Sequence, residues 1–99
     1  MQEAIRINKC DNVAIALKPL LKGQVIIIEE KSVTLLEDIP AGHKFALEDI
    51  DLGSEVIKYG YSIGNVTGKV TMGQWVHTHN LATGLNDVIE YKYDPVDIV

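Results

Sequence analysis

The stretch Val70-Thr71-Met72-Gly73-Gln74-Trp75-Val76 shows the pattern that decides the fold: an apolar residue, two residues, a glycine, two residues and a second apolar residue. The pattern recurs at Leu20…Gly23…Ile26, Ile39…Gly42…Phe45 and Ile50…Gly53…Val56. Each glycine is expected to take a turn conformation that other residues resist, with apolar side chains anchoring the chain on both sides. Because the spacing of the units is irregular, the pattern predicts a compact, loop-rich β domain and not a solenoid.

The segments between the glycine turns are rich in β-branched residues and predict strands. Residues 24–28 and 32–36 flank a charged turn and are expected to form a hairpin. Further strands are expected over residues 3–8, 54–59, 69–79 and 89–93.

Two segments predict short helices. Asp11 or Asn12 is a suitable N-cap for residues 13–17, and Pro19 is expected to end a helix there. Residues 46–50 are expected to form a second helical turn. A chain of 99 residues can bury one modest core. The predicted fold class is therefore mainly β, with one or two short helices in a single domain over residues 1–99.

Composition excludes several classes of function. The net charge is −5 and the lysines are scattered, which argues against a nucleic-acid partner. No apolar run approaches the roughly 18 residues of a membrane span. The single cysteine, Cys10, forms no internal disulfide, and residues 1–8 lack the apolar segment of a signal peptide. A cytoplasmic location is the simplest expectation.

The histidines are the strongest candidates for chemistry. His77 and His79 lie two residues apart in a strand-like run, so both imidazoles are expected on one face. Such a pair can hold a metal ion, an anionic oxygen or a reacting proton. His43 follows the repeat glycine Gly42, so the histidines converge if the two turns pack side by side. The alternative is that they are partly buried histidines bonded to the backbone.

The residues around the histidines have a functional and a structural interpretation. Lys44 can neutralise an anionic substrate or be an ordinary solvated lysine. Asn80 can bind a hydroxyl or carboxylate group, or cap the turn that leads to residues 81–84. Trp75 is expected in the core or at a subunit contact. Cys10 has no activating partner in sequence, and the glycine-rich segment 60–68 lacks the Lys-Ser/Thr ending of a phosphate-binding loop.

Four motifs in order resemble the N-terminal SAF domain of the altronate and galactarate dehydratase family. They are Asp11-Asn12-Val13-Ala14-Ile15-Ala16-Leu17, Gly42-His43-Lys44-Phe45-Ala46-Leu47, Val56-Ile57-Lys58-Tyr59-Gly60 with Ile63-Gly64, and Val76-His77-Thr78-His79-Asn80-Leu81. The resemblance runs from about residue 5 to residue 93. It implies a β-clip fold and a reaction in which a sugar acid loses water to give a 2-keto-3-deoxy product.

The resemblance also implies roles for the candidate residues. Lys44 is expected to meet the substrate carboxylate, with Asn80 as a further substrate-binding residue. His43, His77 and His79 are expected to offer proton-transfer groups, and His77 and His79 are candidate ligands of a divalent metal, iron (Fe²⁺) or Mn²⁺, in the complete enzyme.

The long family members continue beyond the position of Val99 into a larger catalytic part. The chain is therefore expected to be a small subunit or N-terminal domain that is inactive alone. Its expected partners are a large catalytic dehydratase subunit or domain and a sugar-acid substrate, with a homo-oligomer as a further possibility. Two alternatives stay open: the small subunit of a sulfolactate sulfo-lyase, and a non-catalytic carbohydrate-binding or assembly module.

Overall fold

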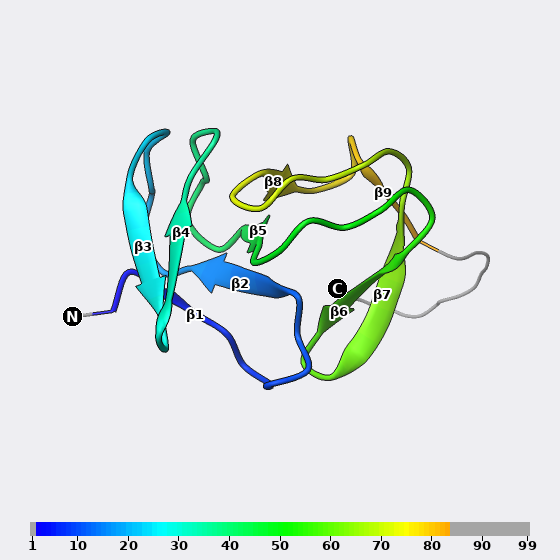
Figure 1. Cartoon of the computed structure of the whole chain (residues 1–99), viewed down its shortest axis with the longest axis horizontal. Coiled ribbons are helices and arrows are strands. Elements are labelled where there is room, and N and C mark those ends of the chain that lie inside the picture. The colour runs from blue at the N-terminus through cyan, green and yellow to red at the C-terminus, as the bar shows by residue number, and fades with distance from the viewer. Residues whose placement is uncertain (1, 84–99) are drawn as a thin grey trace.

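The computed structural model describes residues 2–83, and all regular elements within them are strands (Figure 1). The nine strands are β1 (Ala4–Ile5), β2 (Val13–Ala16), β3 (Val25–Ile28), β4 (Lys31–Thr34), β5 (Lys44–Ala46), β6 (Glu55–Lys58), β7 (Tyr61–Val66), β8 (Trp75–Val76) and β9 (Leu81–Ala82). The mainly β fold class is confirmed. This part of the chain contains no helix long and apolar enough to cross a membrane.

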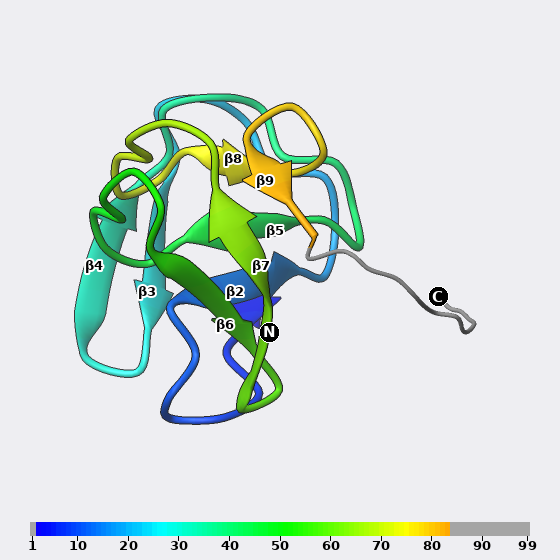
Figure 2. The same ribbon diagram turned by 90° about the vertical axis from the view of Figure 1, so that its right-hand side faces the viewer.

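The strands form three small antiparallel sheets. A central sheet has the order β1-β2-β5-β8, the β3–β4 hairpin stands alone, and β6, β7 and β9 form the third sheet. In Figure 1 the β3–β4 hairpin lies at one end of the molecule and the β6–β7 hairpin at the other, with β2, β5 and β8 between them. Figure 2 shows the same arrangement from the side of β6 and β7.

The predicted glycine turns are formed. The backbone φ angles of the four repeat glycines lie between 82° and 89°, a region that L-residues with a Cβ rarely occupy. The apolar residue that precedes each turn pairs with its counterpart in another turn, since Leu20 bridges Ile39 and Ile50 bridges Val70. The turns therefore pack as two pairs, one pair for each hairpin.

The two pairs of turns reveal a duplicated backbone plan. β3 and β6 begin 30 residues apart (25 and 55), as do β4 and β7 (31 and 61). The first tip residue of each hairpin has a positive φ, 58° at Glu29 and 57° at Tyr59. We call residues 20–42 the first unit and residues 50–73 the second unit. The glycine spacing looks irregular in sequence because each unit holds one turn before its hairpin and a different one after it.

The core has two parts, separated by β5. The first cluster contains the largest buried side chains around the β3–β4 hairpin, namely Leu20, Ile26, Leu35, Ile39 and Phe45. The second cluster consists largely of valines: Val13, Val56, Val66, Val70 and Val76. Phe45 belongs to the first cluster and its neighbour Ala46 to the second, as alternation along a strand requires. β5 therefore contributes side chains to both core clusters, one from each of its faces.

Both predicted helices are wrong. Residues 13–17 contain β2, which pairs with β1 on one side and with β5 on the other, and these tertiary contacts outweigh the short helical pattern. Asn12 caps no helix: its side-chain oxygen accepts the backbone N–H of Ile57 at 2.8 Å. Residues 46–50 contain the end of β5 and the bridge residue Ile50, with no helical turn.

Several predicted strands are confirmed with shorter bounds. The hairpin expected over 24–28 and 32–36 is formed by β3 and β4, and the strand over 54–59 is β6. The long strand predicted over 69–79 is wrong, because the Gly73 turn precedes β8 and a second turn follows it at residues 77–80. The strand expected at 3–8 is reduced to β1. The strand expected at 89–93 lies outside the described residues.

Candidate functional site

His43 and His77 meet across the β5–β8 ladder. Phe45 pairs with Trp75 and Lys44 pairs with Val76, so the next position of the ladder brings His43 opposite His77. Their ring centroids lie 4.8 Å apart, with 56° between the ring planes. His43 and His77 therefore come together, but through the pairing of β5 with β8, because the turns themselves are paired Leu20 with Ile39 and Ile50 with Val70.

Trp75 lies at the centre of the group. Its indole stacks on the His77 imidazole, with centroids 5.5 Å apart and 8° between planes. The His43 and His79 rings lie 5.5 Å and 5.2 Å from it. The indole Nε1–H donates a hydrogen bond to His43 Nδ1 at 3.3 Å. We call His43, Trp75, His77 and His79 the histidine cluster.

The turn after β8 positions His77 and His79. The expectation that both project from one strand face is wrong, because the chain leaves the strand after Val76. Asn80, only 7% exposed, accepts the His77 backbone N–H through Oδ1 at 2.9 Å and donates from Nδ2 to the Trp75 carbonyl oxygen at 2.8 Å. Of the two interpretations offered for Asn80, the structure shows the turn cap. His79 is exposed, and its ring is tilted by 51° relative to the indole plane.

The Lys44 side chain lies on the face of β5 opposite to that of Phe45 and the histidine cluster. It alternates with Phe45 and shares its face with its ladder partners Ile15 and Val76. Partial burial, followed by the positive charge of Lys58, lowers the pKa of Lys44 below its ordinary value. Among residues 2–83, Lys44 forms no ion pair.

The charged neighbours that shift the pKa of His77 are all basic side chains. Its pKa is lowered first by partial burial, and then by the charges of His43, Lys44 and His79. No carboxylate among the described residues contributes to the shift. His77 is therefore neutral near pH 7 and keeps a lone pair for accepting a proton. In a chain of net charge −5, this local excess of positive charge favours an anionic oxygen as ligand.

The metal predicted for His77 and His79 is not supported by a local ligand set. Within residues 2–83, no group of three or more His, Cys, Asp and Glu side chains is placed to hold a metal ion. Two imidazoles supply fewer ligands than protein metal sites normally use. The residues of this part of the chain therefore do not fit a complete metal site, and any further ligands come from elsewhere.

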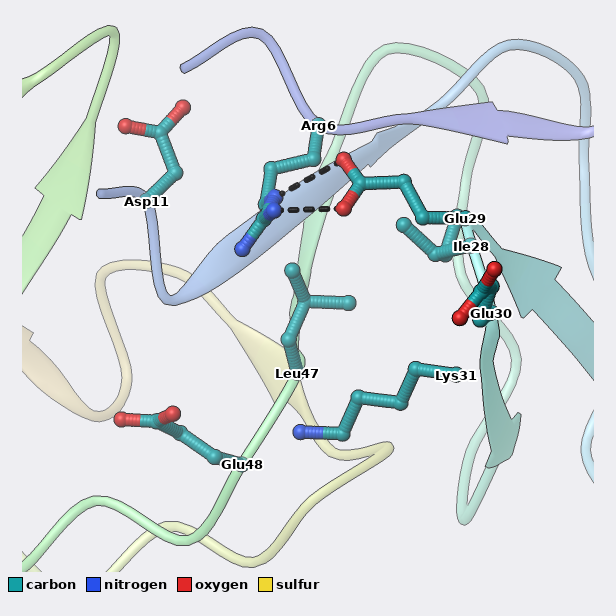
Figure 3. Close-up of a pocket in the computed structure, with 8 residues that line it drawn as sticks. All are labelled: Arg6, Asp11, Ile28, Glu29, Glu30, Lys31, Leu47 and Glu48. Atoms are coloured by element: carbon teal, nitrogen blue, oxygen red, sulfur yellow. Dashed lines mark hydrogen bonds and ion pairs between the residues drawn. The ribbon is translucent and has the colours of Figure 1, made fainter. Parts of the chain in front are cut away.

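A pocket of about 350 Å³ lies on another part of the surface (Figure 3). Its walls come from the N-terminal segment, the tip of the β3–β4 hairpin and the end of β5. The lining residues are Arg6, Asp11, Ile28, Glu29, Glu30, Lys31, Leu47 and Glu48. The Arg6 guanidinium binds both carboxylate oxygens of Glu29, with Nε 3.2 Å from Oε2. The charges here are mixed in sign and partly paired within the chain, so the pocket offers no strong preference for an anion or a cation.

Asp11, at the edge of this pocket, holds the second hairpin. The residue is only 5% exposed. Its carboxylate accepts hydrogen bonds from the backbone N–H groups of Gly60 at 2.8 Å, Tyr59 at 3.0 Å and Asn8 at 3.1 Å. Burial by itself raises the pKa of this carboxyl. The three hydrogen bonds and the charge of Arg6 outweigh that effect and hold the pKa below its ordinary value. Asp11 is therefore a structural anchor, an assignment that the sequence pattern did not reveal.

The sequence analysis missed the central position of Trp75. The indole packs partly on the first core cluster, as expected for a core residue, but it also contacts all three histidines. A usable signal was present: Trp75 and His77 are two residues apart, a spacing that places side chains on the same side of an extended chain. Glu37, which accepts the Trp75 backbone N–H at 3.0 Å, had no such signal because it is distant in sequence.

Comparison with known proteins points to one family. The family model for the altronate/galactarate dehydratase SAF domain matches residues 2–84. The chain is 45% identical to the altronate dehydratase of Escherichia coli (strain K12) over 91 residues, or 92% of this chain and 18% of that protein. It is 37% identical to the altronate dehydratase of Bacillus subtilis (strain 168) over 95 residues, covering 96% of this chain and 19% of the relative.

A shorter relative covers only part of the chain. The (2R)-sulfolactate sulfo-lyase subunit alpha of Paracoccus pantotrophus is 47% identical over 51 residues, which is 52% of this chain and 76% of that subunit. The chain thus spans about a fifth of the length of the two altronate dehydratases, but most of the length of a lyase subunit that is itself small.

Proposed function

Because the chain belongs to the altronate/galactarate dehydratase SAF-domain family, we propose that it contributes the histidine cluster to the active site of a sugar-acid hydro-lyase. The observation that carries the proposal is the position of His77, whose imidazole lies 4.8 Å from the His43 ring and stacks on Trp75, and whose pKa is lowered by burial and by neighbouring basic side chains. The relatives named above are dehydratases and a sulfo-lyase subunit, which supports an elimination reaction on an anionic substrate.

Within this proposal, His77 is the base that removes the proton next to the substrate carboxylate. A base must be deprotonated before it reacts, and the lowered pKa of His77 keeps its imidazole neutral. Lys44 projects from the opposite face of β5, but its charge is among those that lower the pKa of His77, which supports a role in attracting the carboxylate. His79, exposed at the edge of the cluster, is available to the departing hydroxyl group.

The proposal includes a large catalytic partner, covalently joined or separate. The chain spans 18% of the E. coli altronate dehydratase, and the histidine cluster supplies no complete metal shell within the described residues. A divalent metal held mainly by the partner would supply charge stabilisation for the enediolate. Cytoplasmic location and the identity of the sugar acid stay predictions.

The test uses the complex of the chain with the large catalytic part from the same source. His77→Ala is expected to lower the rate of sugar-acid dehydration by about 10²–10⁴-fold, because general-base catalysis is worth roughly that factor. Thr78→Ala, in the same turn and exposed, is the matched control and is expected to keep the parental rate. A His77→Ala complex that assembles and turns over at the parental rate would contradict the proposal.

A second candidate is the small subunit of a sulfolactate sulfo-lyase. It is favoured by the match that covers 76% of a separate alpha subunit. The same complex, supplied in parallel with altronate, galactarate and sulfolactate, separates the two: release of sulfite identifies the sulfo-lyase, and formation of a 2-keto-3-deoxy acid identifies the hydro-lyase. Tight sugar-acid binding by the chain alone, with no turnover in any complex, would instead indicate a binding module.

A further inference from the structure

The hydrogen bond between Trp75 and His43 defines which nitrogen of His43 carries the proton. An indole N–H is a donor only, so the atom that it contacts must offer a lone pair. The contacted atom is His43 Nδ1, 3.3 Å from Trp75 Nε1. A neutral imidazole holds one proton, and with Nδ1 acting as acceptor that proton resides on Nε2.

The indole is held firmly enough to impose this choice. The Trp75 backbone N–H donates to Glu37 Oε2 at 3.0 Å, and its carbonyl oxygen accepts from Asn80 Nδ2 at 2.8 Å. One ring face is stacked on His77, and the side chain packs against the first core cluster. Trp75 is thus fixed through its backbone, its ring face and its Nε1 atom, which leaves His43 little freedom to change partners.

We propose that Trp75 is a positioning residue that fixes His43 with its proton on Nε2, so that His43 donates a hydrogen bond to a substrate oxygen and does not ligate a metal. A metal ligand needs a free lone pair on the coordinating nitrogen. In His43 the Nδ1 lone pair is occupied by the indole and Nε2 carries hydrogen. A neutral imidazole N–H stabilises negative charge that develops on an oxygen, in the manner of an oxyanion-hole donor, without transferring its proton.

This inference assigns different tasks to the two facing imidazoles. His77 keeps a lone pair and accepts a proton, whereas His43, 4.8 Å away, presents an N–H to an oxygen of the same substrate. The assignment of the substrate oxygen rests on the proposed function. The tautomer and its cause do not, since they are properties of the isolated chain.

The first experiment therefore needs no enzyme activity. Long-range ¹H–¹⁵N correlation spectra of the ¹⁵N-labelled chain near pH 8 are expected to show His43 with a protonated Nε2 and an unprotonated Nδ1. In Trp75→Phe, which keeps an aromatic ring but has no donor, the His43 nitrogens are expected to shift toward the average of the two tautomers. A parental His43 with its proton on Nδ1, or an unchanged tautomer in a folded Trp75→Phe chain, would overturn the inference.

A second measurement covers the case in which Trp75→Phe does not fold. In the parental chain, a scalar coupling through the hydrogen bond is expected between Trp75 Nε1 and His43 Nδ1. Finding that the indole proton couples to neither His43 nitrogen and exchanges with water as fast as an exposed indole would likewise overturn the inference.

The final experiment examines the donor role in the complex with the large catalytic part. His43→Gln replaces the imidazole with an amide that still donates, and is expected to keep kcat/KM within about tenfold of the parent. His43→Phe removes the donor and is expected to lose about 10²–10³-fold, the usual effect of deleting one oxyanion donor. Equal losses in the two variants would overturn the donor role. Failure of the proposed function would look different, since His77→Ala would then also have no effect.

Discussion

The first and second units share a backbone plan but are held in place by different contacts. Both hairpins have a tip residue with φ near +58°, Glu29 at 58° and Tyr59 at 57°. The tip of the first unit is held by the ion pair of Arg6 and Glu29, whose side chains are 22% and 59% exposed. The tip of the second unit is held by the buried carboxylate of Asp11. Surface ion pairs contribute little to stability, whereas a buried charge bonded to three N–H groups contributes much more.

The glycine turn that follows the hairpin is also more closely packed in the second unit than in the first. A Cβ built on Gly42 would meet nothing within 4 Å, whereas one on Gly73 would collide with the carbonyl oxygen of Thr34. Each of these glycines lies two residues before a strand at the site: Gly42 precedes β5, with His43 between them, and Gly73 precedes β8, which begins at Trp75. The second unit is therefore the more tightly constrained one, and it positions the residue at the centre of the histidine cluster.

The largest loss of stability is expected from Gly73→Ala in the second unit, with Gly42→Ala in the first unit as its matched control. Both substitutions put an alanine at a positive φ, which costs about 1–2 kcal/mol. Only Gly73→Ala adds a collision with backbone, so its free energy of unfolding is expected to fall by about 3–5 kcal/mol in total. Urea unfolding of the two variants measures the difference. Equal losses would show that the two turns are equally open and would remove this asymmetry between the units.

The next largest effect is expected from the hairpin anchors. Asp11→Asn keeps the size of the side chain but removes the charge and one acceptor, so that the backbone N–H of Tyr59 or of Gly60 loses its partner. We expect a loss of about 2–4 kcal/mol in the free energy of unfolding, because hydrogen bonds to a charged group are individually worth about 1.5–3 kcal/mol.

The control for this prediction is Arg6→Gln in the first unit. It breaks the exposed pair with Glu29 and is expected to cost less than about 1 kcal/mol. Urea unfolding under identical conditions compares the two. If Arg6→Gln proved as destabilising as Asp11→Asn, the contrast between an exposed and a buried anchor would be wrong.

The features of the backbone that depend on local sequence could be predicted, whereas the contacts between distant residues could not. The glycine turns were predictable, because a positive φ leaves a local pattern in the sequence, whereas the meeting of His43 with His77 depends on the pairing of β5 with β8. The β2 strand was misread as a helix, since its conformation depends on β1 and β5, which are separate in sequence. The Trp75–His43 bond and the Asp11 anchor join residues 32 or more positions apart, and no local pattern encodes such a contact.

The smallest effect expected is a pH dependence of stability in two windows, one for each region. The pKa of folded His77 is lowered, first by partial burial and then by His43, Lys44 and His79, below the ordinary value of 6.5. Below pH 6.5 the unfolded chain therefore binds the proton more readily, and the stability contributed by neutral His77 is lost as the pH falls through its lowered pKa.

The second window belongs to Asp11. Burial raises its pKa, but the hydrogen bonds from Gly60, Asn8 and Tyr59 and the charge of Arg6 lower it more, so the folded value lies below 3.8. Its stabilising contribution is present above pH 3.8 and is lost as the pH falls from there through the folded pKa. Urea midpoints measured from pH 8 to pH 3 are expected to fall in both windows, with His77→Gln removing the upper part of the fall and Asp11→Asn the lower. If His77→Gln left the fall below pH 6.5 unchanged, the lowered pKa assigned to His77 would be wrong, while the anchor in the second unit would stand.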